Sequence, residues 1–172
     1  MNKVLKFETE RLLLRPTTLN DAPFIYELMN TPKWHQFIGD RKITSEQKAR
    51  EYIELKMLPQ LERLGFTNNT VIRKSDNQKL GTCGLYDREG LEGLDIGFAF
   101  LPQYEGQGYG YESAKVLMDA AFNQFGMTMV DAITSKENHA SQKLLKKLGM
   151  SLEATVILPG DNEELLRFRI TK

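Results

Sequence analysis

The spacing of apolar residues predicts two helices in the first half of the chain. Residues 22–29 carry an apolar stripe at helical spacing, made of Phe24, Ile25, Leu28 and Met29. A second helix begins at a capping box, with Thr44 as the cap and Gln47 three residues later, and extends to about Leu64. Pro59 lies inside this second segment, so we expect a kink or an early end there.

Short apolar runs bounded by turn residues predict the strands. They cover residues 11–15, 70–73, 79–86, 94–101, 129–134, 152–158 and 165–170. Two further helices are expected, one ending at about Phe125 and one over residues 140–148. The order β-α-α-β-β-β-α-β-α-β-β predicts a single α/β (mixed α+β) domain over residues 1–172, with a mixed sheet of about seven strands and four helices.

Composition excludes several classes of protein. The chain has 172 residues, 41% of them hydrophobic, and its 23 Lys and Arg balance 23 Asp and Glu. It therefore has the composition of a soluble domain and no global electrostatic footprint for DNA or RNA. The single cysteine, Cys83, excludes an intrachain disulfide. No secretory signal or membrane-spanning run is evident, so we expect a cytoplasmic monomer or homodimer without membrane or nucleic-acid partners.

A glycine-rich loop, Gly-Gln-Gly-Tyr-Gly at residues 106–110, lies directly between a predicted strand and a predicted helix. Alternate glycines let backbone N–H groups converge, and the helix N-terminus adds unpaired N–H groups and partial positive charge. This combination binds phosphate or pyrophosphate, although a flexible turn is the alternative interpretation. The loop lacks the Gly-Lys-Ser/Thr of a Walker A loop. Its spacing also differs from the dinucleotide fingerprint. Because the hairpins predicted upstream do not belong to a dinucleotide fold, we regard Asp131, about 20 residues further on, as a coincidental match to a ribose acid.

Two spaced motifs resemble those of the GNAT N-acetyltransferases, in particular the RimJ/RimL-like branch that acetylates the N-termini of ribosomal proteins. The first is Pro-x-Tyr-x-Gly-x-Gly-Tyr-x-x-Glu-Ser-Ala, from Pro102 to Ala114. The second is Asn-His-Ala-Ser at residues 138–141, followed by Leu-Leu-Lys-Lys-Leu-Gly-Met at residues 144–150. Residues 8–16 are similar to the first strand of this branch. The resemblance spans nearly the whole chain and implies the acyl-CoA N-acyltransferase fold, with a mostly antiparallel sheet and acetyl-CoA as co-substrate.

The resemblance also implies roles for individual residues. The implied cofactor-binding residues are Phe98, Ala99, Phe100, Gly106, Gln107, Gly108, Tyr109, Gly110, Tyr111, Asn138 and Ser141. In that pattern the strand residues pair their backbone with pantetheine, and the loop holds the pyrophosphate. Asn138 hydrogen-bonds the cofactor arm and Ser141 lies near the thioester sulfur, so both are catalytic candidates.

Three positions depart from the family pattern. Glu105 stands where the family usually has Arg or Gln, and we expect its carboxylate to turn away from the pyrophosphate because like charges repel. Leu145 replaces a tyrosine that many relatives use as the thiolate acid, which leaves the Ser141 hydroxyl or water as the substitute. Met150 replaces the usual Phe, a tolerable apolar exchange.

The pattern leaves the general base and the acceptor site open. Asp95 opens the cofactor strand and is the acidic residue that we assign as catalytic, as a relay for the proton of the amine, although Asp95 and Glu92, each taken singly, are typical of solvated turn acids. Trp34 and His35 lie between the first two helices, where this family shapes its acceptor site, although packing and surface roles are common for such residues. The two histidines, His35 and His139, lack ligand spacing, so no metal is expected.

Three functions follow as hypotheses. The leading one is an N-acetyltransferase that moves an acetyl group from acetyl-CoA to a primary amine, by direct attack in a ternary complex. The amine belongs to a protein N-terminus or to a small molecule, and the neutral net charge favours neither. The second hypothesis is a CoA-binding module that is weakly active or inactive. The third is a nucleotide-binding regulator that recognises adenine nucleotides without the pantetheine arm.

Overall fold

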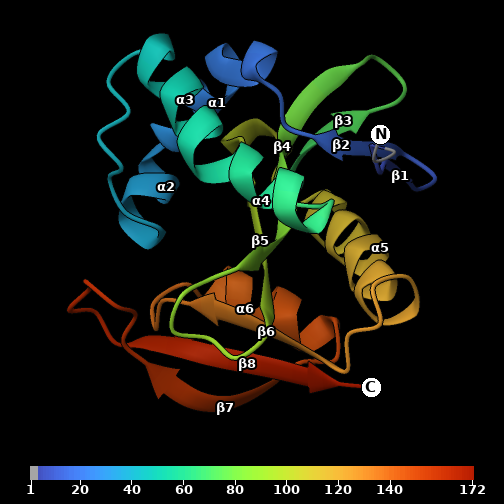
Figure 1. Cartoon of the computed structure of the whole chain (residues 1–172), viewed down its shortest axis with the longest axis vertical. Helices are drawn as coiled ribbons and strands as arrows, with labels where there is room; N and C mark the ends of the chain where they lie inside the picture. Colours follow the sequence, from blue (N-terminus) through green and yellow to red (C-terminus); the bar gives the residue numbers. More distant parts are fainter. Residues whose placement is uncertain (1–3) are drawn as a thin grey trace.

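An eight-stranded sheet forms the centre of the protein, in the order β1-β2-β3-β4-β5-β6-β8-β7 (Figure 1). The computed structural model describes residues 4–172. The strands are β1 (Phe7–Glu8), β2 (Leu12–Pro16), β3 (Asn68–Arg73), β4 (Gln78–Asp87), β5 (Leu94–Phe100), β6 (Met129–Thr134), β7 (Ser151–Val156) and β8 (Leu165–Thr171). Neighbouring strands are antiparallel except β5 and β6, which are parallel. The expected mixed, mostly antiparallel sheet is confirmed, with the short β1 as an additional strand.

Within residues 4–172, six α-helices and three shorter helical segments accompany the sheet. They are α1 (Ala22–Met29), α2 (Pro32–Phe37), α3 (Glu46–Tyr52), α4 (Leu58–Leu64), α5 (Tyr109–Asn123) and α6 (His139–Lys147), with η1 (Leu19–Asp21), η2 (Ile53–Met57) and η3 (Pro102–Tyr104). The α1, α5 and α6 helices and all strands but β1 lie within two residues of their predicted bounds. Local apolar spacing was therefore sufficient to find them.

Two buried clusters lie on opposite faces of β5. Leu94 and Ile96 belong to the cluster that contains Leu117 of α5 and Leu145 of α6. Ala99 packs against the other cluster, which α1 and α3 form. Because successive strand residues point to opposite faces, α5 and α6 cover one face of β5 while α1 and α3 cover the other.

The second predicted helix differs from expectation at its start and at its middle. Its cap is Ser45, whose hydroxyl accepts from the N–H of Lys48 at 3.1 Å, so the Thr44 capping box was wrong by one residue. The helix is interrupted by η2, a π-helical segment, before α4 resumes. Pro59 explains the interruption, because its ring has no N–H and clashes with the carbonyl four residues earlier. The expected disturbance at Pro59 is confirmed.

The α2 helix was missed because Pro32 was interpreted only as the end of α1. Pro32 is instead the first residue of α2, where a missing N–H costs nothing. Thr31 is the cap, and its hydroxyl accepts from the N–H of Trp34 at 3.3 Å. Proline therefore ends one helix and begins the next.

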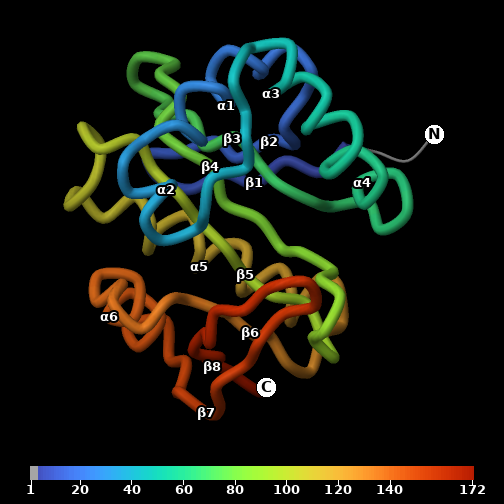
Figure 2. Tube along the Cα trace, turned by 90° about the vertical axis from the view of Figure 1, so that its left-hand side faces the viewer, coloured from blue at the N-terminus to red at the C-terminus, as the bar shows by residue number. Residues whose placement is uncertain are grey.

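The sheet opens between β5 and β6. Within the described chain, these two strands share a single pair of partners, Asp95 and Asp131. Beyond that pair, toward their carboxyl ends, the strands do not continue as a ladder. Figure 2 shows β5 descending from the group that contains α1 to α4 toward β6, β7 and β8. The opening leaves the backbone of residues 98–100 without a β6 partner, on the path to the glycine loop.

Candidate active site

The glycine loop at residues 106–110 forms the N-terminus of α5. Gly106 and Gly108 have φ angles of +72° and +84°, a left-handed backbone that side chains rarely adopt. Gly108 caps the helix, and its carbonyl accepts the first intrahelical bond from the N–H of Glu112 at 3.0 Å. The N–H groups before Glu112 therefore have no partner within the helix and converge as an anion site. This geometry fits the pyrophosphate of CoA.

Arg11 lies against this loop from the turn between β1 and β2. Its guanidinium donates to the carbonyl of Gln107 at 3.1 Å and pairs with Glu112 at 2.9 Å. It also lies 4.4 Å from the ring centroid of Tyr109. These contacts hold the glycine loop against the turn between β1 and β2. They also place the positive charge of Arg11 beside the loop. Sequence reasoning missed this role, because the partners lie about a hundred positions away along the chain.

Glu112 has a larger role than the helix-dipole acid that its first-turn position suggests. Besides Arg11, its carboxylate accepts from the hydroxyl of Thr9 at 2.6 Å. Burial alone would raise the pKa of Glu112, but the bonds from Thr9 and Arg11 lower it below its usual range. The ionised Glu112 therefore holds the β1–β2 turn to the first turn of α5.

Glu105 pairs with Lys33 of α2. This contact agrees with the expectation that the carboxylate is held away from an anion on the loop. It also links the loop to α2, the helix that contains Trp34 and His35.

The second motif begins at the cap of α6 and meets the glycine loop in the middle of that helix. The Asn138 side chain caps that helix, and its Oδ1 accepts from the N–H of Ser141 at 3.2 Å. A Cβ atom placed on Gly110 would lie 2.8 Å from Leu144 and 3.8 Å from Phe100. The structure thus brings the end of β5, the start of α5 and the middle of α6 together around one position.

The predicted cofactor-binding residues differ in which of their groups are available to a bound molecule. The side chain of Tyr109 is buried in the main core, and its hydroxyl accepts from Arg73 at 3.3 Å, so only its backbone faces the loop. Gln107 is exposed, and its amide donates to the carbonyl of Gln103 at 3.1 Å. Phe98 and Phe100 pack toward the α5 cluster, and Ala99 packs toward the α1 cluster. The set as a whole fits a CoA molecule held mainly by backbone groups.

Ser135 was not singled out from the sequence. It follows β6 directly and is buried, and its Oγ has no hydrogen-bond partner among residues 4–172. Its carbonyl accepts from the N–H of Asn138 at 3.2 Å. Ser135 therefore adds an uncommitted hydroxyl near the cap of α6, and no local sequence pattern marks it.

Asp95 is buried, which contradicts its interpretation as a solvated turn acid. Only 1% of its surface is exposed, and Oδ1 accepts from Nε of Arg88 at 3.2 Å. Burial raises the pKa of Asp95, and Arg88 offsets that rise only in part. Glu92, by contrast, is exposed, as a turn acid should be. The parallel partner Asp131 is bound by Arg169 at 2.6 and 3.0 Å, a structural pair rather than a ribose acid.

Asp95 and Trp34 lie on the same side of β5. Asp95 alternates with Gly97 and Ala99 along the strand, so the three share one face. Trp34 packs against the cluster on that face, and its buried Nε1 has no partner within residues 4–172. His35 is 41% exposed and lies 3.9 Å from Asp40. The structure therefore puts Trp34, but not the His35 side chain, against the core beside the cofactor strand.

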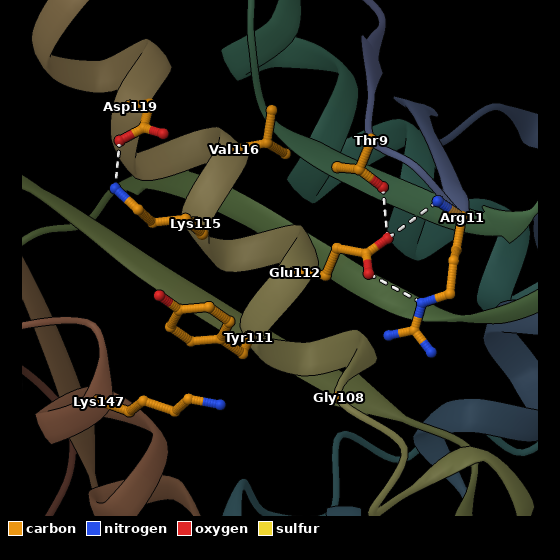
Figure 3. A pocket seen from close by; sticks show the side chains of 9 residues that line it. All are labelled: Thr9, Arg11, Gly108, Tyr111, Glu112, Lys115, Val116, Asp119 and Lys147. Atoms are coloured by element: carbon orange, nitrogen blue, oxygen red, sulfur yellow. Dashed lines mark hydrogen bonds and ion pairs between the residues drawn. The ribbon is translucent and has the colours of Figure 1, made fainter.

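A pocket of about 460 Å³ lies along the outer side of α5 (Figure 3). It borders the glycine loop at Gly108 and receives Arg11, Tyr111 and Lys147. Cys83 lies away from it in the core, and burial raises the pKa of its thiol to about 12. Within residues 4–172, no group of three or more His, Cys, Asp or Glu side chains is arranged to hold a metal ion. No helix of this part of the chain is long and apolar enough to cross a membrane.

Comparisons with known proteins agree with this geometry. Residues 11–151 match the family described as the acetyltransferase (GNAT) domain. An uncharacterized N-acetyltransferase, p20 of Bacillus licheniformis, is 29% identical over 148 residues, which cover 84% of this chain and 82% of p20. The spermidine N(1)-acetyltransferase of Escherichia coli K12 is 22% identical over 84% of this chain and 75% of its own length.

A solved structure with the same fold is RimL, a ribosomal L7/L12 α-N-protein acetyltransferase in complex with coenzyme A. Its TM-score is 0.82 at 18% identity, and the match covers 97% of this chain and 98% of RimL. At this identity the likeness concerns the fold alone. The family match covers most of the chain, and it confirms the family expected from the two motifs. The chain belongs to the GNAT acetyltransferase family and is an acyltransferase.

Proposed function

We propose that this acyltransferase transfers an acetyl group from acetyl-CoA to a primary amine, by direct attack in a ternary complex. The observation that carries the proposal is the meeting of the glycine loop, the open end of β5 and the middle of α6 at Gly110. The glycine loop suits the phosphates of CoA, and the end of β5 together with α6 suits its thioester arm. The relatives named for spermidine and for a ribosomal protein both acetylate amines, which supports an amine acceptor.

In this proposal, backbone groups hold most of the co-substrate. The N–H groups of residues 106–111 bind the pyrophosphate, with the Arg11 guanidinium nearby. The backbone of residues 98–100, which lacks a β6 partner, pairs with pantetheine. Asn138 and Ser141 bind the arm near the sulfur. Acetyl-CoA supplies the activated acyl group, a thioester.

The amine must lose a proton before it attacks. An ammonium of the lysine type has a pKa near 10.4, so at neutral pH most of the amine is protonated. A base near the acceptor site takes up a proton and raises the fraction of the amine that is neutral. We assign this role to Asp95, because it lies on the α1 face of β5 with a raised pKa. One proton of the ammonium passes to this base. The neutral nitrogen then bonds to the carbonyl carbon, the carbon–sulfur bond breaks, and a second proton passes from the nitrogen to the departing thiolate, directly or through water.

The departing thiolate needs a proton or hydrogen-bond donors. Leu145 is buried among apolar side chains and offers none. Ser141 is half-buried on the adjacent turn of α6 and carries a hydroxyl, so we assign it as the group that stabilises the sulfur, directly or through water. For the acceptor, we assign Trp34 as an apolar wall, with His35 at the rim.

One observation favours a second function. The absence of a phenol at Leu145 removes the acid that many members of the family use, and this suits a CoA-binding module with little or no turnover. In this alternative the loop binds CoA as proposed, while the chemistry at the thioester is lost.

A thiol-release assay separates these functions. The protein is incubated with acetyl-CoA and a panel of amines: spermidine, free amino acids and peptides with a free N-terminus. Release that depends on an amine, with an acetylated product seen by mass spectrometry, supports the acetyltransferase. Tight binding of CoA without release for any amine supports the module. Equal affinity for ADP and CoA would overturn both and indicate a nucleotide-binding regulator.

A further inference from the structure

The face of the sheet that carries Asp95 continues across β6 to β8 (Figure 1). Asp95 pairs with Asp131 of β6, and Asp131 pairs with Arg169 of β8, so these three residues share one face. Phe168 packs into the cluster of α5 and α6 on the opposite face. Because strand residues alternate between the two faces, Arg167 and Arg169, which flank Phe168, both lie on the Asp95 face.

Arg167 has a guanidinium whose hydrogen bonds are not made within residues 4–172. Its Nε is buried without a partner in this range. Its Nη2 lies 3.8 Å from Oε2 of Glu153, which is too far for a hydrogen bond. Arg169, by contrast, donates to both carboxylate oxygens of Asp131, at 2.6 and 3.0 Å. A half-buried cation with unbonded N–H groups is costly, so Arg167 has donors available to a bound anion.

Arg167 lies where the sheet opens. It is the strand partner of Ile133 on β6, two positions beyond Asp131. Beyond Asp131, β6 no longer pairs with β5 in the described chain. The glycine loop starts α5, which covers the opposite face, so Arg167 is not part of the proposed phosphate site. Its charge is therefore on the face proposed for the acceptor.

A second guanidinium lies beside the assigned base on this face. Arg88 follows β4 and donates from Nε to Oδ1 of Asp95 at 3.2 Å. Its carbon Cζ lies 5.8 Å from the ring centroid of Tyr86, the strand partner of Asp95. Within residues 4–172, the two Nη groups of Arg88 make no hydrogen bond. Asp95 is therefore flanked by a cation that still has donors for an anion.

These charges favour one class of amine over another. A polyamine would bring a second positive charge close to Arg88 and Arg167, and like charges repel. An amine that also carries a carboxylate would satisfy the unbonded guanidinium donors, in the planar geometry that arginine offers. Glu153 is the acid near Arg167, and because its side chain is 43% exposed, solvent weakens its opposing effect.

We propose that the acceptor is a free amino acid, whose amine lies toward Asp95 and whose carboxylate is bound by Arg167 first and by Arg88 second. This inference deepens the proposed function and rests on it, because it concerns the amine side of the same site. Free amino acids are then acetylated in preference to spermidine and to their own carboxamides, which have nearly the same shape but lack the negative charge.

Steady-state thiol release with acetyl-CoA and matched pairs of acceptors tests the inference. The pairs are the twenty amino acids, β-alanine and γ-aminobutyrate, each beside its carboxamide, with spermidine as a separate acceptor. For the best pair, kcat/KM of the wild type should favour the acid by about tenfold or more, as expected for a charge-assisted contact. Arg167→Gln should bring the two values close to equal, and Arg167→Lys should keep part of the preference, because it keeps the charge.

The ratio of the two substrates within one variant separates recognition from a general loss of activity. Arg88→Gln should lower turnover of both substrates, because Arg88 also pairs with Asp95, and should reduce the ratio less than Arg167→Gln does. Arg50→Gln is the matched control, since Arg50 is exposed on α3 and its loss changes the net charge equally. Its ratio should equal that of the wild type. The Kd for CoA, measured by calorimetry, should stay unchanged in Arg167→Gln.

The possible failures are distinguishable. Turnover of spermidine or of the carboxamides in preference to the free amino acids would overturn the inference and leave acetyl transfer to a primary amine intact. A preference for the acid that survives in Arg167→Gln would overturn the role of Arg167. Absence of thiol release with every amine would overturn the proposed function, and the inference with it.

Discussion

A Cβ atom on Gly110 would lie 2.8 Å from Cδ1 of Leu144, so the first turn of α5 and the middle of α6 are in close contact, and a side chain at position 110 requires the end of Leu144 to move. Gly110 belongs to the motif proposed for the pyrophosphate, and Leu144 belongs to the motif proposed for the thioester arm. Their contact fixes the spacing between the two proposed halves of the CoA site.

The first prediction concerns this contact. Gly110→Ala should be nearly neutral, because the end of the Leu144 side chain can move and alanine favours a helix by about 1 kcal/mol. Gly110→Val should destabilise by about 1–3 kcal/mol through overpacking. Chemical denaturation measures both. In the double variant Gly110→Val with Leu144→Ala, the loss in the free energy of unfolding should be smaller than the sum of the losses in the two single variants. Losses that are strictly additive would contradict the contact.

The second prediction concerns Asp95 as the base. Asp95→Asn should lower kcat by about a hundredfold or more, while the Kd for CoA changes little. Below its pKa the carboxyl is protonated and cannot accept a proton, so kcat/KM of the wild type should fall as the pH falls. This acid limb should vanish in Asp95→Asn. Glu92→Gln is the control, since Glu92 is an exposed turn acid, and a larger loss in that variant would reject the assignment.

The third prediction concerns a buried carboxylate in the fold. Asp21 is fully buried and accepts from Arg15 at 2.7 and 2.9 Å and from the backbone of Thr18 at 2.8 Å, and it pairs with Lys79 at 2.7 Å. Burial alone would raise the pKa of Asp21, but these partners lower it well below its usual range. Asp21→Asn should cost about 3 kcal/mol at neutral pH, because it leaves the cations unpaired.

The pH dependence of that cost has a definite sign. The folded pKa of Asp21 lies below the unfolded value of about 3.9. The unfolded state therefore takes up its proton first, and the stabilisation is fully present above about pH 4 and is lost as the pH falls below it. Denaturation curves from pH 7 down to pH 3 should show the gap between wild type and Asp21→Asn narrowing at the acid end. A gap that widens there would contradict the ion-pair account.

The fourth prediction concerns the acceptor. Trp34→Phe keeps an aromatic ring but removes apolar area at the cluster against which Ala99 also packs, so KM for the amine should rise about three- to tenfold at unchanged Kd for CoA. His35→Ala should have a smaller effect, because the His35 side chain is largely exposed. Steady-state kinetics with the best amine from the thiol-release panel measure both. A rise in the Kd for CoA alone would indicate that Trp34 belongs to the CoA site rather than to the acceptor site.

The features that depend on the spacing of neighbouring residues could be predicted from the sequence. The apolar stripe of α5 and the glycines before it depend on neighbouring residues, so both were predicted. The pairing of Arg11 with Glu112 joins positions that are distant in sequence, and no local pattern reports it. Asp95 was assigned as catalytic, but taken singly it was interpreted as a solvated turn acid, because its burial depends on Arg88 and on the packing of the sheet. Tyr109 matched the cofactor motif, yet its side chain packs into the core.

In the proposed function, the pyrophosphate of CoA binds the glycine loop at the start of α5. A crystal structure of the protein with CoA measures this directly. We expect pyrophosphate oxygens within hydrogen-bonding distance of the backbone N–H groups of residues 106–111, with pantetheine running along residues 98–100. Clear density for CoA whose pyrophosphate lies away from residues 106–111 would contradict it.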